Sequence, residues 1–190
     1  MRRIVTAAVA VLATATLSAS PARAAEPKTA PAGGASAKSV VGWAILGWGS
    51  AIGLGASFQL PLVPQGLIHD PGFKVHDSLD LDLGLDYLYY WNHYHSGPYA
   101  YDVSEFNLHA GLLWNFWLTP QVAVYPKAGL GYSFAHYDYA PDWPAGYGHT
   151  EYGGLYPELA VGGRLLIGNA LTLRGELGWA GLKIGLGFDF

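Results

Sequence analysis

The strongest alternation of hydrophobic and polar positions runs from Leu79 to Trp91. Every second side chain of this stretch is apolar or aromatic, and Asp80, Asp82 and Asp86 lie between them. A β-strand sends alternate side chains to opposite faces, so the pattern predicts a strand with one apolar and one acidic face. The run is longer than a usual strand of about 5–6 residues and is long enough to cross a bilayer at a tilt. An apolar outer face with a polar inner face is typical of a transmembrane β-barrel wall.

The same two-residue period recurs along the chain and predicts eight strands. They span 41–48, 51–62, 79–91, 104–118, 122–137, 155–167, 171–179 and 182–190. Short turns at 49–50, 119–121 and 168–169 and longer connections at 64–77, 92–102 and 138–153 join them. The uncharged stretch Val40–Val63 is also long enough for a transmembrane helix, although its glycines make a poor helix interior.

Eight such strands predict an all-β fold, an antiparallel up-and-down transmembrane β-barrel. Closure removes the strand edges that a bilayer does not tolerate, and eight strands enclose a lumen that side chains can just about fill. An even strand count places both ends of the barrel on one side, with the loops 92–102 and 138–153 on the other. The apolar faces of the last six predicted strands carry no Lys, Arg, Asp or Glu. Each such residue would cost roughly 2–4 kcal/mol at the bilayer midplane.

Aromatic side chains collect at two levels of the predicted wall. Such girdles mark the two membrane interfaces, whereas a soluble barrel would place its apolar residues inside. The level near the loops holds Tyr89, Trp91, Tyr132, Phe134 and Trp179, and the level near the termini holds Trp114, Phe116, Phe188 and Phe190.

The N-terminal part of the chain predicts export. Residues 1–24 read as a cleaved signal peptide, with Arg2 and Arg3 before an apolar stretch and a small-x-small site at residues 22–24. Residues 25–39, rich in Ala, Gly, Pro and Ser, predict a flexible periplasmic linker before a barrel at 40–190. Removing the signal leaves 7 of the 10 basic residues against 14 acidic ones, which argues against a nucleic-acid partner. With no cysteine, the chain offers neither a disulfide nor a thiolate metal site.

The C-terminal residues carry a specific resemblance. The alternating ending Leu182, Ile184, Leu186, Phe188 and Phe190 looks like the assembly signal of bacterial outer-membrane barrels. In size the chain resembles the small eight-stranded barrels of the OmpA/OmpX type. The resemblance implies a Gram-negative outer membrane, contact with its lipid, and recognition by the barrel-assembly machinery. Pro126 and Pro157 depart from the pattern, because each deletes a ladder hydrogen bond.

The inward faces predict a network of charges in the lumen. Carboxylates and bases that pair across a narrow lumen stay charged, whereas unpaired ions there would be costly. The network comprises Asp80, Asp82, Asp86, Glu105, His109, Lys127, Glu158, Arg164, Arg174, Glu176, Lys183 and Asp189. The sequence therefore favours a non-catalytic, monomeric barrel with a plugged lumen and a structural or surface-interaction role, without a metal or cofactor. A porin-like narrow pore is the alternative, since several inward glycines would leave room for water.

Three further interpretations concern the loops and the strand ends beside them. A lipid-modifying enzyme would need a Ser/His/acid group at the rim, for which Ser133, Glu151 and either His136 or His149 are the candidates. His93 and His95 could share a metal, but two histidines are a weak signal. The tyrosines and tryptophans of the loops 92–102 and 138–153 suit a surface ligand or lipid headgroups.

Overall fold

The structure, a computed structural model, describes residues 37–68, 75–90, 101–139 and 149–190. These residues form one closed antiparallel barrel in which each strand pairs with its sequence neighbours and β8 pairs with β1. The predicted fold class is thereby confirmed. The strands are β1 (Ser39–Gly47), β2 (Ala51–Val63), β3 (His76–Tyr90), β4 (Tyr101–Trp117), β5 (Val122–Tyr139), β6 (His149–Ile167), β7 (Leu171–Gly178) and β8 (Gly181–Asp189).

The stretch that also suited a helix forms the first hairpin. β1 and β2 pair from Ser39–Gln59 to Gly47–Ala51. Residues 48–50 form the turn between them, and Gly49 and Ser50 both have positive φ, 69° and 70°. The two-strand interpretation is therefore right, and β1 begins at Ser39, one residue before the predicted barrel boundary. Across the described part of the chain, no helix is long and apolar enough to span a membrane.

Several predicted boundaries are wrong, and the errors concentrate at the loops. β3 begins at His76 within the predicted connection, and β4 begins at Tyr101 within a predicted loop. The largest error concerns the segment 138–153, because β5 continues to Tyr139 and β6 begins at His149. Trp91 of the predicted girdle, His93, His95 and the signal peptide lie outside the described residues.

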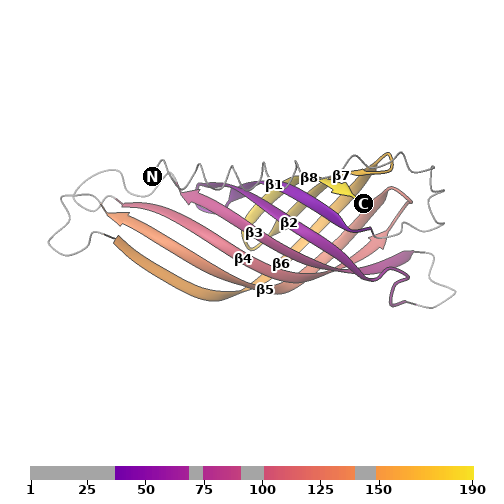
Figure 1. Ribbon diagram of the computed structural model, residues 1–190, viewed down its shortest axis with the longest axis horizontal. Helices are drawn as coiled ribbons and strands as arrows, with labels where there is room; N and C mark the ends of the chain where they lie inside the picture. Colours follow the sequence, from indigo (N-terminus) through magenta and orange to yellow (C-terminus); the bar gives the residue numbers. More distant parts are fainter. Residues whose placement is uncertain (1–36, 69–74, 91–100, 140–148) are drawn as a thin grey trace.

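These longer strands make the barrel uneven in height. Ser39 pairs with Asp189, so both ends of the barrel meet at one rim, here called the terminal rim. At the opposite far rim β7 ends at Gly178 beside Ala160, whereas β6 continues upward from there to His149. The outer parts of β4, β5 and β6 form a high wall beyond the short strands β7, β8, β1 and β2 (Figure 1).

The outer surface is an apolar belt. The predicted assembly-signal residues lie along the outward face of β8, with Ile184 53% and Leu186 59% exposed. Tyr89, Tyr132, Phe134 and Trp179 lie towards the far rim, and Trp114 and Phe116 towards the terminal rim. The rings of Trp114 and Phe116 pack against each other at a tilt, as do those of Tyr132 and Phe134, with ring centroids 4.8 and 4.7 Å apart.

The predicted strands carry no charge on their outward faces, but the observed strands are longer and add acidic residues at both rims. Asp77 pairs with Phe116 on the outward side of β3, where its carboxylate accepts hydrogen bonds from the Trp114 indole at 2.7 Å and the Leu67 amide at 2.8 Å. Those donors replace water around the buried charge. At the far rim Asp102, Asp138 and Glu151 also face outward, on wall that rises above the apolar belt.

Both prolines lie at positions where no ladder hydrogen bond requires a backbone N–H. The β4–β5 pairing runs to Leu113–Lys127 and resumes at Phe116–Val124, so Pro126 lies in a gap of that ladder. On β6, the Leu159 carbonyl accepts from the Trp179 amide, so the odd-numbered residues of β6 aim their backbone groups toward β7. Pro157 therefore faces the side on which β7 has already ended.

The lumen is packed by large side chains set against inward glycines. A Cβ added to Gly84 would lie 2.2 Å from Nε2 of His109, and one added to Gly131 would lie 2.1 Å from the Tyr156 ring. Gly185 makes the same room for Trp43, and Gly162 for Tyr125. The glycines thus accommodate side chains rather than water, which contradicts the expectation that they leave the lumen open.

This packing predicts which glycine substitutions destabilise the barrel. Gly84→Ala forces the His109 ring to move out of its place between two carboxylates, so we expect a loss of about 1–3 kcal/mol in the free energy of unfolding. Gly175→Ala, which meets nothing within 4 Å, is the matched control. Urea unfolding of the refolded barrels in detergent measures both, and equal stability of the two variants would contradict the packing argument.

Candidate functional site

A lysine stands at the centre of the lumen network. Lys127 of β5 is buried, and its Nζ lies 2.7 Å from Oδ2 of Asp82 and 3.0 Å from Oε1 of Glu158. A third carboxylate, that of Glu176, lies 3.9 Å away and also accepts a hydrogen bond from the Tyr125 hydroxyl at 2.9 Å. Carboxylates from three strands therefore converge on one ammonium group.

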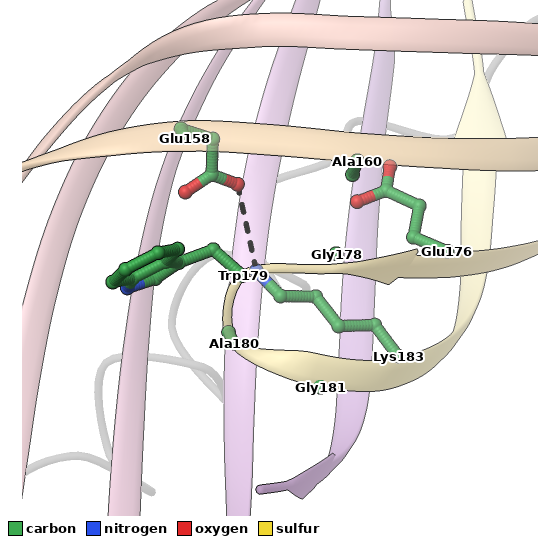
Figure 2. A pocket seen from close by; sticks show the side chains of 8 residues that line it. All are labelled: Glu158, Ala160, Glu176, Gly178, Trp179, Ala180, Gly181 and Lys183. Atoms are coloured by element: carbon green, nitrogen blue, oxygen red, sulfur yellow. Dashed lines mark ion pairs between the residues drawn. The ribbon is translucent and has the colours of Figure 1, made fainter.

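Lys183 of β8 forms a second centre nearer the far rim. Its Nζ lies 2.5 Å from Oδ2 of Asp86 and 4.0 Å from Oε1 of Glu158. Figure 2 shows Glu158 and Lys183 approaching each other beside Trp179 and the turn between β7 and β8. The recess lined by these residues has no space for a water molecule. The imidazole of His109 lies between Asp82 and Asp86, 3.6 Å from each.

Arginine takes the place of lysine towards the terminal rim. The guanidinium of Arg164 lies 3.5 Å from Asp80 and 3.5 Å from Asp189, over the ring of Trp117. Arg174 donates a hydrogen bond to the Ser39 hydroxyl at 3.2 Å, and Asn115 donates to Asp80 at 2.9 Å. A planar guanidinium can bridge two carboxylates and stack on an aromatic ring at the same time, which a lysine cannot do.

One side of the lumen is apolar, which the sequence did not reveal. The inward side chains of β1, namely Val41, Trp43 and Ile45, pack with Ala51 and Leu88. The Trp43 indole donates to the Ser57 hydroxyl at 3.0 Å, so its one polar group is satisfied. Because the other face of β1 meets the apolar belt, neither face is polar. This explains why the stretch from residue 40 showed so little alternation.

The structure places every predicted lumen residue on the inward side. Ten of the twelve pair with one another around Lys127, Lys183 and Arg164, and Arg174 donates to Ser39 instead. Glu105 stands apart, nearer the far rim, where it accepts hydrogen bonds from the Tyr90 and Ser133 hydroxyls at 2.8 and 2.6 Å. Carboxylates outnumber cations in this set, and Lys127, Lys183 and Arg164 are each shared by at least two carboxylates.

The high wall is the second candidate site. Residues 149–158 of β6, here called the open edge, have no partner strand on the β7 side among the residues that the structure describes. Tyr152 is 61% and Leu155 77% exposed, and the side chain of Glu151 is 85% exposed. Tyr156 stacks on Trp179 at the step where β7 ends. The sequence pattern predicts a loop over most of this stretch. The inward tyrosines at positions 152 and 156 nevertheless keep the two-residue period of a strand.

The candidate catalytic group is not assembled around His136, and the side chain of His149, the other candidate imidazole, lies outside the described residues. Ser133 faces the lumen and donates to Glu105, whereas His136 faces outward and lies 3.2 Å from Asp138 and 3.8 Å from Glu151. Serine and imidazole are therefore on opposite faces of the sheet. No group of His, Asp or Glu suited to hold a metal occurs in the part of the chain covered by the structure.

Comparisons with known proteins bear on the fold alone. No protein-family model matches the sequence, and no curated protein matches it. A designed transmembrane β-barrel aligns with a TM-score of 0.52 at 17% identity, over 81% of this chain and 95% of the other. Ail, the attachment invasion locus protein of Yersinia pestis, aligns with a TM-score of 0.50 at 10% identity, over 83% of this chain and 99% of the other. The chain thus has the fold of small transmembrane barrels.

The convergence on Lys127 predicts strong coupling within the lumen. Lys127→Met leaves Asp82 and Glu158 buried without their ammonium partner, and we expect a loss of about 3–5 kcal/mol. Adding Asp82→Asn to Lys127→Met should restore part of that loss, because one of the stranded charges is then gone. Urea unfolding of both single variants and the double variant gives the coupling, with the exposed Lys38→Met as control. Strict additivity would show that the pair is not coupled.

Proposed function

We propose that this protein is an integral outer-membrane barrel that binds a partner at the cell surface and does not catalyse a reaction. The fold, the apolar belt between two levels of aromatic residues, and the terminal Phe190 support the outer membrane as its location. The predicted signal peptide supports export. In this arrangement the terminal rim faces the periplasm, and the high wall stands outside the cell.

The observation that carries the proposal is the unequal height of the barrel. A bilayer-spanning wall needs strands of only about 9–11 residues, and β7 and β8 are close to that length. β4, β5 and β6 have 17, 18 and 19 residues, so they extend well past what the membrane requires. The parts of these strands that extend beyond the lipid are available for contact with another molecule.

The open edge supplies the means of contact. Its N–H and C=O groups can pair with an extended segment of another protein, which adds a strand where β7 stops. An unpaired edge is a hazard that proteins usually suppress. Here Pro157 removes an N–H donor only at the lower end of the open edge, beside Trp179. Glu151, Gly153 and Leu155 keep both of their backbone hydrogen-bonding groups.

The filled lumen weighs against the narrow pore. Lys127 and Lys183 bridge carboxylates across it, the Val41 cluster packs one side, and Arg164 with Trp117 closes it near the terminal rim. An ion would have to break several buried ion pairs to pass. A catalytic function has still less support, because Ser133 and His136 lie on opposite faces of the sheet.

Surface labelling tests the proposed orientation. The chain has no native cysteine, so single substitutions give a clean signal. We expect a membrane-impermeant maleimide to label Glu151→Cys on intact cells. Asn169→Cys, in the exposed turn at the terminal rim, should react only after the envelope is opened. Labelling of Asn169→Cys alone on intact cells would reverse the proposed orientation.

Planar-bilayer recording tests the sealed lumen. We expect the refolded mature chain to insert without discrete conductance steps, and a heat-dependent shift on a gel would show that it is folded. Steps whose size changes in Arg164→Ala or Glu176→Ala would assign the function to the lumen and contradict the proposal. Steps that both substitutions leave unchanged would point to a path outside the ion-pair network.

A further inference from the structure

We propose that the open edge of β6 takes up an extended peptide segment carrying Lys or Arg at alternate positions. This inference rests on the proposed function and names the chemistry of the partner. Three features of the open edge support it: the direction of its backbone groups, the charge beside it, and the aromatic surface on its inner side.

The backbone of the open edge is ready for an antiparallel partner. The hydrogen bond from the Trp179 amide to the Leu159 carbonyl, at 3.0 Å, fixes which residues of β6 point toward β7. Continuing upward by twos, the backbone groups of Leu155, Gly153 and Glu151 point the same way. A strand laid here continues the place of β7 and leaves the β5–β6 ladder intact.

The high wall at the far rim carries acidic side chains and neither lysine nor arginine. The sequence contains no Lys or Arg from position 75 to 126 or from position 128 to 163, which covers the high wall and both segments that leave it. The Glu151 carboxylate is 85% exposed directly at the edge, and Asp138 lies one strand away on the same outward face. The basic residues of the described barrel strands are in the lumen, where they are already paired or buried.

Because side chains alternate between the two faces of a β-strand, this acidity favours basic residues at every second position of an added strand. In an antiparallel pair, side chains directly opposite each other lie about 4.5–5.5 Å apart, so every second residue of an added strand faces the side of Glu151. An acidic residue there would be repelled, and a lysine or arginine would be attracted. The inner side of the edge also favours cations, because the rings of Tyr152, Tyr156 and Trp179 can receive an ammonium or guanidinium group.

The same charges disfavour a second copy of this chain as the occupant. Two open edges paired with each other would bring two Glu151 residues and two acidic wall faces together without a Lys or Arg between them. Like charges across a strand pair are destabilising. The monomer expected from the sequence agrees with this argument.

The experiment uses the refolded mature chain in zwitterionic nanodiscs and labelled peptides of about ten residues. Three peptides alternate Thr with Lys, Gln or Glu, and a fourth is the Lys peptide N-methylated at every second residue. Fluorescence anisotropy gives the affinities. We expect the Lys peptide to bind roughly fivefold more tightly than the Gln peptide and the Glu peptide to bind most weakly. The preference should disappear near 1 M salt, where the screening length falls to about 3 Å.

Matched variants separate the edge from the charge. Leu155→Pro removes one edge N–H, and we expect roughly tenfold weaker binding of the Lys and Gln peptides, with Leu155→Ala as control. The N-methylated peptide tests the same pairing without altering the protein, should Leu155→Pro fail to fold. Glu151→Gln should reduce the preference for Lys, because the carboxylate directly at the edge is gone, and leave the affinity for the Gln peptide unchanged.

The outcomes test two claims separately, which are strand addition at the open edge and the preference for a basic segment. Equal binding of the Lys and Gln peptides that is lost in Leu155→Pro would overturn the basic partner and keep strand addition. Tight binding of the N-methylated peptide would show that charge alone attracts the segment, and would overturn pairing at the edge. Absence of binding by all of the peptides would overturn strand addition itself. Self-association of the barrel at the same concentrations would identify a second copy as the occupant.

Discussion

The structure depends on closing the backbone hydrogen-bond ladder inside a medium that offers no hydrogen bonds. Lipid cannot satisfy a free N–H or C=O group, so a sheet that crosses the membrane must end where it began. The pairing of β1 with β8 achieves this from Ser39 to Leu46. Closure in turn fixes the inside and the outside of every strand, and the apolar belt, the charged lumen and the two rims follow from it.

Closure also creates the problem that the lumen network solves. Charges that face inward are removed from bulk water and are tolerable only when they are paired. Lys127 and Lys183 each serve several carboxylates, and Arg164 serves two while it covers Trp117. The glycines opposite His109 and Tyr156 leave space for these rings. The interior is therefore a packed core of mixed polarity, and its contribution is to hold the wall in shape.

The constraint ends where the membrane ends, and the architecture changes there. Above the belt the ladder no longer has to close, and β6 runs on without β7. Water can satisfy an open edge outside the bilayer, so the cost of leaving it unpaired is low. The high wall is thus free to take a function that the spanning part cannot have. Its acidic side chains and its tyrosines are the chemistry that the proposed partner would meet there.

The sequence by itself determined the fold class and the inward position of every predicted lumen charge, because the contrast between lipid and lumen imprints a two-residue period on each spanning strand. It also placed the Gly49–Ser50 and Gly168–Asn169 turns, because glycine, serine and asparagine favour the backbone of tight turns. It did not determine the height of β5 and β6, since Asp138, Glu151 and Gly153 face water on strands that have no lipid to contrast with. Only the tertiary structure showed that the Val41 cluster fills one side of the lumen and that Ser133 and His136 lie apart. It also decided which cation serves which carboxylate, because partners such as Lys183 and Asp86 come from strands far apart in the sequence and meet only when the barrel closes.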